Sequence, residues 1–158
     1  MKRYFVLLAA VFASFLFVNS ASADAIISGH VCVIDGNTVQ IGGKSKEGKC
    51  WGGIDVFLFG SVAPSLEDTC TDKNDNTWEC GKAARNFLAN LIRQRSISCF
   101  HIDGAFSQNK PVVTCISGRK DLSLALILNG LAKATDQENN RYTLEETAAK
   151  KARRGMWK

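Results

Sequence analysis

The sequence lacks the residue spacing that marks a zinc site. It contains no C-x-x-C pair, and its two histidines, His30 and His101, do not stand at ligand spacing. Internal repeats and low-complexity segments are also missing. With 158 residues, the chain is expected to form one domain with a substantial core.

A long hydrophobic run is missing as well. The apolar stretch from Phe5 to Val18 is too short to span a bilayer comfortably. It follows the basic pair Lys2 and Arg3 and precedes the small residues 21–23, which is the pattern of a secretory signal peptide. We expect a signal peptide over residues 1–23, cleavage after Ala23, and a periplasmic or secreted domain over residues 24–158. No cysteine lies near the cut, so a lipoprotein anchor is not indicated.

The exported part carries little excess of charge. Without Lys2 and Arg3, 18 basic and 15 acidic residues remain, a net charge of +3. This mildly basic balance permits a polyanionic partner but does not require one.

Six cysteines are present, and all lie in the exported part. An even number of cysteines in an exported chain predicts disulfides. Six cysteines allow many pairings, and spacing alone does not choose among them.

Alternating and β-branched segments predict the strands. We expect strands over residues 25–35, 37–41, 54–59, 96–102 and 111–117, and a short one within 131–135. Residues 42–49 are expected to form a polar hairpin loop, and residues 60–79 a long loop, a kind that is usually functional or covalently tied.

Three helices are expected. Apolar residues at helical spacing predict one over residues 81–93. Asp121 should start a short helix that ends near Gly130. Thr143 and Glu146 fit a capping box at the start of the last helix. The basic run at the end of that helix is explained by the helix dipole, with a nucleic-acid patch as the alternative; its residues are Lys150, Lys151, Arg153 and Arg154.

The order of these elements is strand, strand, strand, helix, strand, strand, helix, helix. It predicts an α+β fold in which a five-stranded OB-fold Greek-key β-barrel carries three helices on its outside. OB folds often bind oligonucleotides or oligosaccharides, but the fold alone does not assign a function.

Two segments raise the question of a metal ion. Asp35-Gly36-Asn37 separates two apolar runs, and an Asp-Gly pair there favours a hairpin turn because glycine allows a positive φ. Residues 71–76, TDKNDN, are similar to a calcium loop, but Thr77 and Ala83 stand where an EF-hand needs glycine and glutamate. A solvated loop is therefore the better interpretation of residues 71–76.

Several motifs in order resemble the staphylococcal-nuclease-like family, also called thermonuclease-like. VIDGNTV is similar to the family's VIDGDTV, and VFLFGSVAPS stands where the family has I-R-L-x-G-I-D-A-P-E. The Cys-bounded loop with the helix after it, the later pair of strands, and the segments DLSLALILNGLAKA and ARRGMWK match as well. The resemblance covers almost all of the exported part and implies phosphodiester hydrolysis with one calcium ion, a water-activating carboxylate and two arginines.

The residues that would carry this chemistry are missing. The family's first metal aspartate is Asn37 here, and its second is Val62. The two arginines fall at Phe57 and Lys110, and the water-activating glutamate falls at Ser65. The tyrosine and aspartate of the family's hairpin are replaced by Gln108 and Phe106, whereas Asp35 and Pro64 are kept. Loss of one transition-state donor costs roughly 10²–10³ in rate, so the resemblance implies little remaining catalysis.

The resemblance also implies a disulfide pairing. Cys70 and Cys80 would close the loop before the first helix, Cys99 and Cys115 would join two strands of one hairpin, and Cys32 and Cys50 would join the first strand to the start of the third. Each bridge should stabilise the fold by about 2–4 kcal/mol.

We therefore expect a non-catalytic binding or structural module without a cofactor, with a protein or polysaccharide of the cell envelope as its partner. An apolar former cleft would suit such a ligand. Its face would contain four aromatic residues near the old site, with ordinary packing as the alternative: Trp51, Phe57, Phe59 and Trp78. Two rival hypotheses remain. One is a calcium-dependent nuclease with a displaced site that uses Asp35, Glu67 and Lys110; the other is a nucleic-acid-binding module without hydrolysis.

Overall fold

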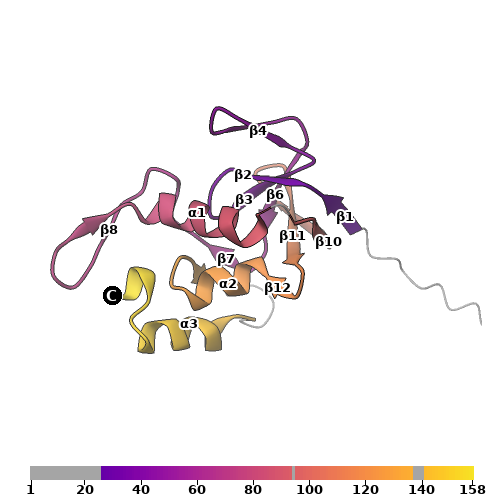
Figure 1. Ribbon diagram of the computed structural model, residues 1–158. Helices are drawn as coiled ribbons and strands as arrows, with labels where there is room; N and C mark the ends of the chain where they lie inside the picture. The colour runs from indigo at the N-terminus through magenta and orange to yellow at the C-terminus, as the bar shows by residue number, and fades with distance from the viewer. Residues whose placement is uncertain (1–25, 94, 137–140) are drawn as a thin grey trace, which may run out of the picture.

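The computed structural model describes residues 26–93, 95–136 and 141–158 (Figure 1). The predicted signal peptide lies outside the described residues. The structure is a mixed α+β fold with one large sheet and three α-helices, as the sequence predicts at this level. None of the described helices is long and apolar enough to cross a membrane.

The large sheet has the strand order β1-β10-β11-β6-β3-β2, with β12 paired to β11. Its strands are β1 (Ile26–Gly29), β2 (Val31–Val33), β3 (Thr38–Ile41), β6 (Ile54–Leu58), β10 (Ile97–Ser107), β11 (Lys110–Ser117) and β12 (Lys120–Asp121). All pairs are antiparallel except β6 and β11, where Phe57 lies opposite Val112. The predicted first strand is divided at His30, so that β1 pairs with β10 while β2 pairs with β3.

Three pairs of short strands, each strand two or three residues long, lie outside this sheet in the described part of the chain. They are β4 (Lys44–Lys46) with β5 (Lys49–Trp51), β7 (Ser61–Val62) with β13 (Lys133–Ala134), and β8 (Cys70–Thr71) with β9 (Thr77–Trp78). The segment expected to be a polar loop is thus itself a hairpin, β4–β5. Figure 1 shows this hairpin projecting from the body of the molecule on one side and the β8 loop on another.

Helix α1 (Cys80–Ile92) packs its apolar face onto the sheet. Ala84 and Leu88 on this face are fully buried, as the helical spacing predicts. At its first turn Gly81 lies against the backbone of Ser65, where any side chain would collide. Gly81 therefore brings the start of α1 close to the loop that follows β7.

Helix α2 (Leu122–Leu128) begins as predicted. The Asp121 side chain accepts a hydrogen bond from the backbone N–H of Leu124 and so caps the helix. Its other carboxylate oxygen accepts from the Tyr142 hydroxyl at 2.6 Å. Burial and this carboxylate raise the pKa of Tyr142, so the phenol stays protonated and donates this bond.

The predicted capping box of α3 (Thr143–Lys151) is wrong. The N-cap residue is Tyr142, without a side-chain cap, and Thr143 is already helical. The Glu146 carboxylate instead accepts from the backbone N–H of Ala134 in β13 and from Lys150. The Glu146 side chain, which the local pattern assigns to the cap, therefore forms its hydrogen bonds elsewhere.

The basic run after α3 is used in packing. Arg154 donates to the backbone carbonyl of Leu128, one of the last carbonyls of α2. Lys150 pairs with Glu146 and lies 4.6 Å from the centre of the Trp157 ring. Two of the four basic residues thus hold the C-terminal segment, including the 3₁₀ turn Gly155–Trp157, against α2 and α3.

Three disulfides join the cysteines as the family resemblance implied. They are Cys32–Cys50, Cys70–Cys80 and Cys99–Cys115. Cys99 and Cys115 lie opposite each other in β10 and β11, and both are buried. Cys32–Cys50 fastens the β4–β5 hairpin to β2.

Candidate functional site

The turn between β2 and β3 is closed by its own side chain. One carboxylate oxygen of Asp35 accepts hydrogen bonds from the backbone N–H groups of Asn37 and Thr38, both at 2.7 Å. This is the local capping that aspartate provides in tight turns. Asp35, the acidic residue that this loop keeps from the family pattern, is therefore engaged by the backbone.

Asn37, at the position of the family's first metal aspartate, is locked onto the segment after β7. Its amide nitrogen donates to the carbonyl of Ala63 at 2.8 Å, and its amide oxygen accepts from the N–H of Ala63 at 2.6 Å. The two bonds use both ends of the amide. A carboxylate could form only the second one, because it cannot donate.

Gly36 has a different role from the predicted one. It is absent from the residues with a positive φ, so the turn does not need glycine for its backbone conformation. A Cβ atom here would lie 2.5 Å from that of Ala63 and 2.8 Å from that of Ala84. Glycine is required because β7 and α1 both approach the turn closely.

Lys110, at one of the two arginine positions, is paired within the sheet. Its amino group lies 3.2 Å from the Asp55 carboxylate and 5.4 Å from the centre of the Phe57 ring. Asp55 also accepts from the Gln40 amide at 2.9 Å, and these bonds hold the pKa of its carboxyl below the ordinary value. Sequence reasoning missed Asp55 and Gln40; the parallel register of β6 and β11, which brings Asp55 beside Lys110, is a tertiary feature.

A pocket of about 260 Å³ lies where the family has its catalytic site. Asn37, Phe57 and Val62 are among the residues that line it, as is Gln108. Leu58 and Val112 add to its apolar part, and Ser61 and Thr135 to its polar part. The structure thus brings together four of the substituted family positions, and two of the four, Phe57 and Val62, are apolar.

Ser65, at the position of the family's water-activating glutamate, and the displaced candidate Glu67 lie in a neighbouring pocket. Ser65 and Glu67 line a space of about 680 Å³ that also includes Val62 and Lys133. Neither Asp35 nor Lys110 is among its lining residues. The three residues of the displaced nuclease hypothesis therefore do not share one pocket.

A calcium ion does not fit the residues at the family's metal position. Calcium takes six to eight oxygen ligands, usually with several carboxylates. Here one carboxylate oxygen of Asp35 and the amide oxygen of Asn37 accept from backbone N–H groups, Asn37 brings no charge, and Val62 has no oxygen in its side chain. Within residues 26–93, 95–136 and 141–158, no group of three or more His, Cys, Asp or Glu could hold a metal ion.

Residues 71–76 form a turn around Asp72. Its carboxylate accepts from the backbone N–H groups of Asn74 and Asn76 and from the Asn76 amide, and these bonds lower its pKa. The acidic side chain of Asp72 in this segment is thus engaged by its own turn.

The four aromatic residues proposed as one face are separated. Phe59 is buried in the core, and Phe57 lines the pocket with Asn37. Trp78 lies in β9 with Lys158 over its ring. Trp51, in the β4–β5 hairpin, is 61% exposed and is the aromatic residue of the four that remains open to a ligand.

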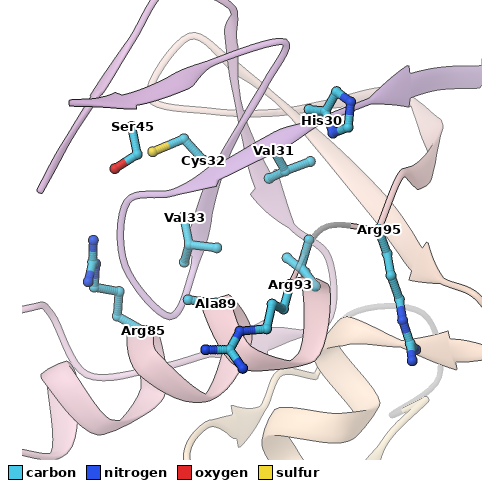
Figure 2. A pocket seen from close by; sticks show the side chains of 10 residues that line it. His30, Val31, Cys32, Val33, Ser45, Arg85, Ala89, Arg93 and Arg95 are labelled. Atoms are coloured by element: carbon cyan, nitrogen blue, oxygen red, sulfur yellow. The ribbon is translucent and has the colours of Figure 1, made fainter.

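A further pocket was not predicted from the sequence. It has a volume of about 190 Å³ and lies between β2, the inner face of the β4–β5 hairpin and α1. Figure 2 shows Arg85 and Arg93 on the same side of α1 with Ala89 between them, and Arg95 extending away from both. The signal was present in the sequence: residues 85, 89 and 93 are four apart and share one helix face.

Comparison with known proteins agrees with the mixed α+β fold. The mixed α+β fold, with its parallel pair β6–β11 and its substituted catalytic pocket, is that of a nuclease-like protein. The model of the family described as staphylococcal nuclease homologue matches residues 58–158. The chain is also 30% identical over 152 residues to the succinoglycan biosynthesis protein ExoI of Rhizobium meliloti (strain 1021), a match that covers 94% of this chain and 74% of that protein. The chain belongs to the staphylococcal nuclease homologue family.

Proposed function

We propose that this protein is an exported, non-catalytic binding module of the staphylococcal nuclease homologue family. The observation that carries the proposal is the double hydrogen bond between Asn37 and Ala63. It gives both the nitrogen and the oxygen of this amide a partner within the protein, which supports a turn that is held without a cation.

The other substitutions support the same conclusion. Cleavage of a phosphodiester develops negative charge, which fixed cationic donors must stabilise. Phe57 supplies none, and Lys110 is already paired with Asp55. A lysine also lacks the forked geometry by which arginine grips a phosphate.

We also propose that the large sheet closes into a barrel. β1 and β2 stand at the two ends of the strand order and are separated by His30 alone. A bent first strand that serves both ends supports a five-stranded OB-type barrel, the architecture expected from the sequence. Export is supported by the three disulfides, which persist in oxidising compartments such as the periplasm.

For the biological process, we propose a role in the production of an extracellular polysaccharide. The support is the similarity to ExoI, which extends over nearly the whole chain and most of that protein. A polysaccharide is then the partner, and the module binds it without cleaving phosphodiester bonds.

A cleavage assay tests this function. The oxidised protein is incubated with plasmid DNA and with RNA, each with calcium and with a chelator, beside an active calcium-dependent nuclease. We expect no calcium-dependent cleavage. Cleavage that is lost in Glu67→Gln but kept in Glu47→Gln, a matched change in the β4–β5 turn, would instead establish the displaced site.

A further inference from the structure

The β4–β5 hairpin presents three lysines and one tryptophan on a single face. Lys44 lies opposite Trp51, and Lys46 lies opposite Lys49, so all four side chains are on the same side of the hairpin. Ser45 and Cys50 are on the other side, where Cys50 is bonded to Cys32. All four residues of the first face are exposed. We call Lys44, Lys46, Lys49 and Trp51 the hairpin face.

The charges of this face are not neutralised within the protein. In the part of the chain that the structure describes, Lys82, Lys110 and Lys150 form ion pairs, whereas Lys44, Lys46 and Lys49 form none. The acidic residue of the hairpin is Glu47, which lies in its turn. Three unpaired ammonium groups and a 61% exposed indole thus stand together on one face, where they are accessible to an anionic ligand.

Helix α1 continues the positive charge behind the hairpin. Arg85 reaches the carbonyl of Gly48 at 3.5 Å and lines the pocket that Ser45 also lines. Figure 2 shows Arg85 extending towards Ser45 and Cys32, with Arg93 further along the same side of the helix. The two arginines thus lie near the Ser45 side of the hairpin, opposite the hairpin face, and add to the positive charge of this end of the molecule.

We propose that the hairpin face binds a polysaccharide that carries carboxylate groups. The lysines would pair with carboxylates along the polysaccharide chain. The flat apolar surface of Trp51 would pack on the C–H face of a sugar ring. This inference rests on the proposed function, since it names the ligand chemistry of the polysaccharide partner.

The same surface is less suited to a nucleic acid. Single-stranded nucleic acid is held by a series of aromatic rings on which successive bases stack. Here Trp51 is the one aromatic residue of the hairpin, and the described pocket behind it has no aromatic lining residue. Its volume of about 190 Å³ is below the range of pockets that enclose a whole drug-sized ligand.

Binding to matched glycans tests the proposal. Carboxymethyl dextran and unmodified dextran share a backbone and differ in carboxylates, and oligo(dT) serves as the nucleic-acid probe. Affinity is measured for the oxidised protein at low and high salt. The test variant is Lys44→Gln/Lys46→Gln/Lys49→Gln, and the control Arg119→Gln/Lys120→Gln/Lys151→Gln removes the same charge from exposed positions elsewhere.

We expect carboxymethyl dextran to bind in preference to dextran and to be released by salt. The hairpin variant should lose about tenfold in affinity, the control variant less than about threefold, and Trp51→Ala about threefold or more. The proposal is overturned by equal binding of both dextrans, by equal losses in the two triple variants, by tighter binding of oligo(dT), or by no binding. Calcium-dependent cleavage of nucleic acid by the same preparation would reject the proposed non-catalytic function but not the proposed ligand of the hairpin face. Absence of glycan binding would reject the proposed ligand of the hairpin face alone.

Discussion

Asn37 and Ala63 are joined by two hydrogen bonds that run in opposite directions, from side-chain amide to carbonyl at 2.8 Å and from backbone N–H to amide oxygen at 2.6 Å. The amide imitates a peptide group and pairs with the chain as a strand would. The position that resembles a metal ligand thereby becomes a structural tie between the β2–β3 turn and the segment after β7. This tie supports the proposal that the turn is held without a cation.

Replacing this amide with a carboxylate should weaken the fold. In Asn37→Asp the donor to the Ala63 carbonyl is lost and two oxygens face each other, so we expect a loss of about 1–3 kcal/mol in the free energy of unfolding. Urea unfolding measures it. Asn90→Asp, at an exposed position of α1, is the control and should change stability by less than about 0.5 kcal/mol. Equal effects would show that the amide contributes nothing specific.

A methyl group at Gly36 should destabilise the protein through crowding. Gly36→Ala places a Cβ against Ala63 and Ala84, and we expect a cost of about 1–3 kcal/mol. Gly104→Ala is the comparison, since Gly104 has a φ of +70° and open space around it. If backbone conformation alone mattered, Gly104→Ala would be the costlier change in thermal unfolding.

The Asp55 carboxylate should stabilise the fold above its pKa. Because Gln40 and Lys110 lower that pKa in the folded state, the contribution is present at neutral pH and is lost as the pH falls through the folded-state value. The difference in stability between the wild type and Asp55→Asn should therefore shrink between about pH 4 and pH 2. A difference that stays constant over this range would mean that neither Gln40 nor Lys110 lowers the pKa of Asp55 in the folded state.

Removal of the buried bridge between β10 and β11 should be costly. The free energy of unfolding of Cys99→Ala/Cys115→Ala is expected to be about 2–5 kcal/mol lower, because the bridge reduces the conformational entropy of the unfolded chain. Chemical denaturation of the oxidised proteins measures the loss, with mass spectrometry to verify that the other two bridges remain. A variant as stable as the wild type would contradict the assigned role.

The sequence predicts more of the fold than of the site. Local periodicity and turn chemistry predict the helix over residues 81–93, the Asp121 cap and the strands of the main sheet. These features depend on residues that are close in the sequence, so the sequence alone can predict them. The α3 capping box fails because Glu146 bonds to Ala134, which is twelve residues away in the chain. The separation of Trp51, Phe57, Phe59 and Trp78 likewise depends on strand register.

The site shows the same division. The sequence reveals which family residues are replaced at Asn37, Phe57 and Val62, but not what the replacements do. The partner of Asn37 lies 26 residues further on, and that of Lys110 lies on a parallel strand. Contacts of this kind are set by the packing of the whole domain, so they become visible only in three dimensions.

The most direct test of the central claim is a calcium titration of the oxidised protein by isothermal calorimetry. With Asn37 bonded to Ala63 and Asp35 bonded to the turn, we predict no heat of binding at millimolar calcium and no increase in melting temperature. Saturable binding of one calcium ion that is abolished by Asp35→Asn would contradict the account, because it would place a working metal site at the turn.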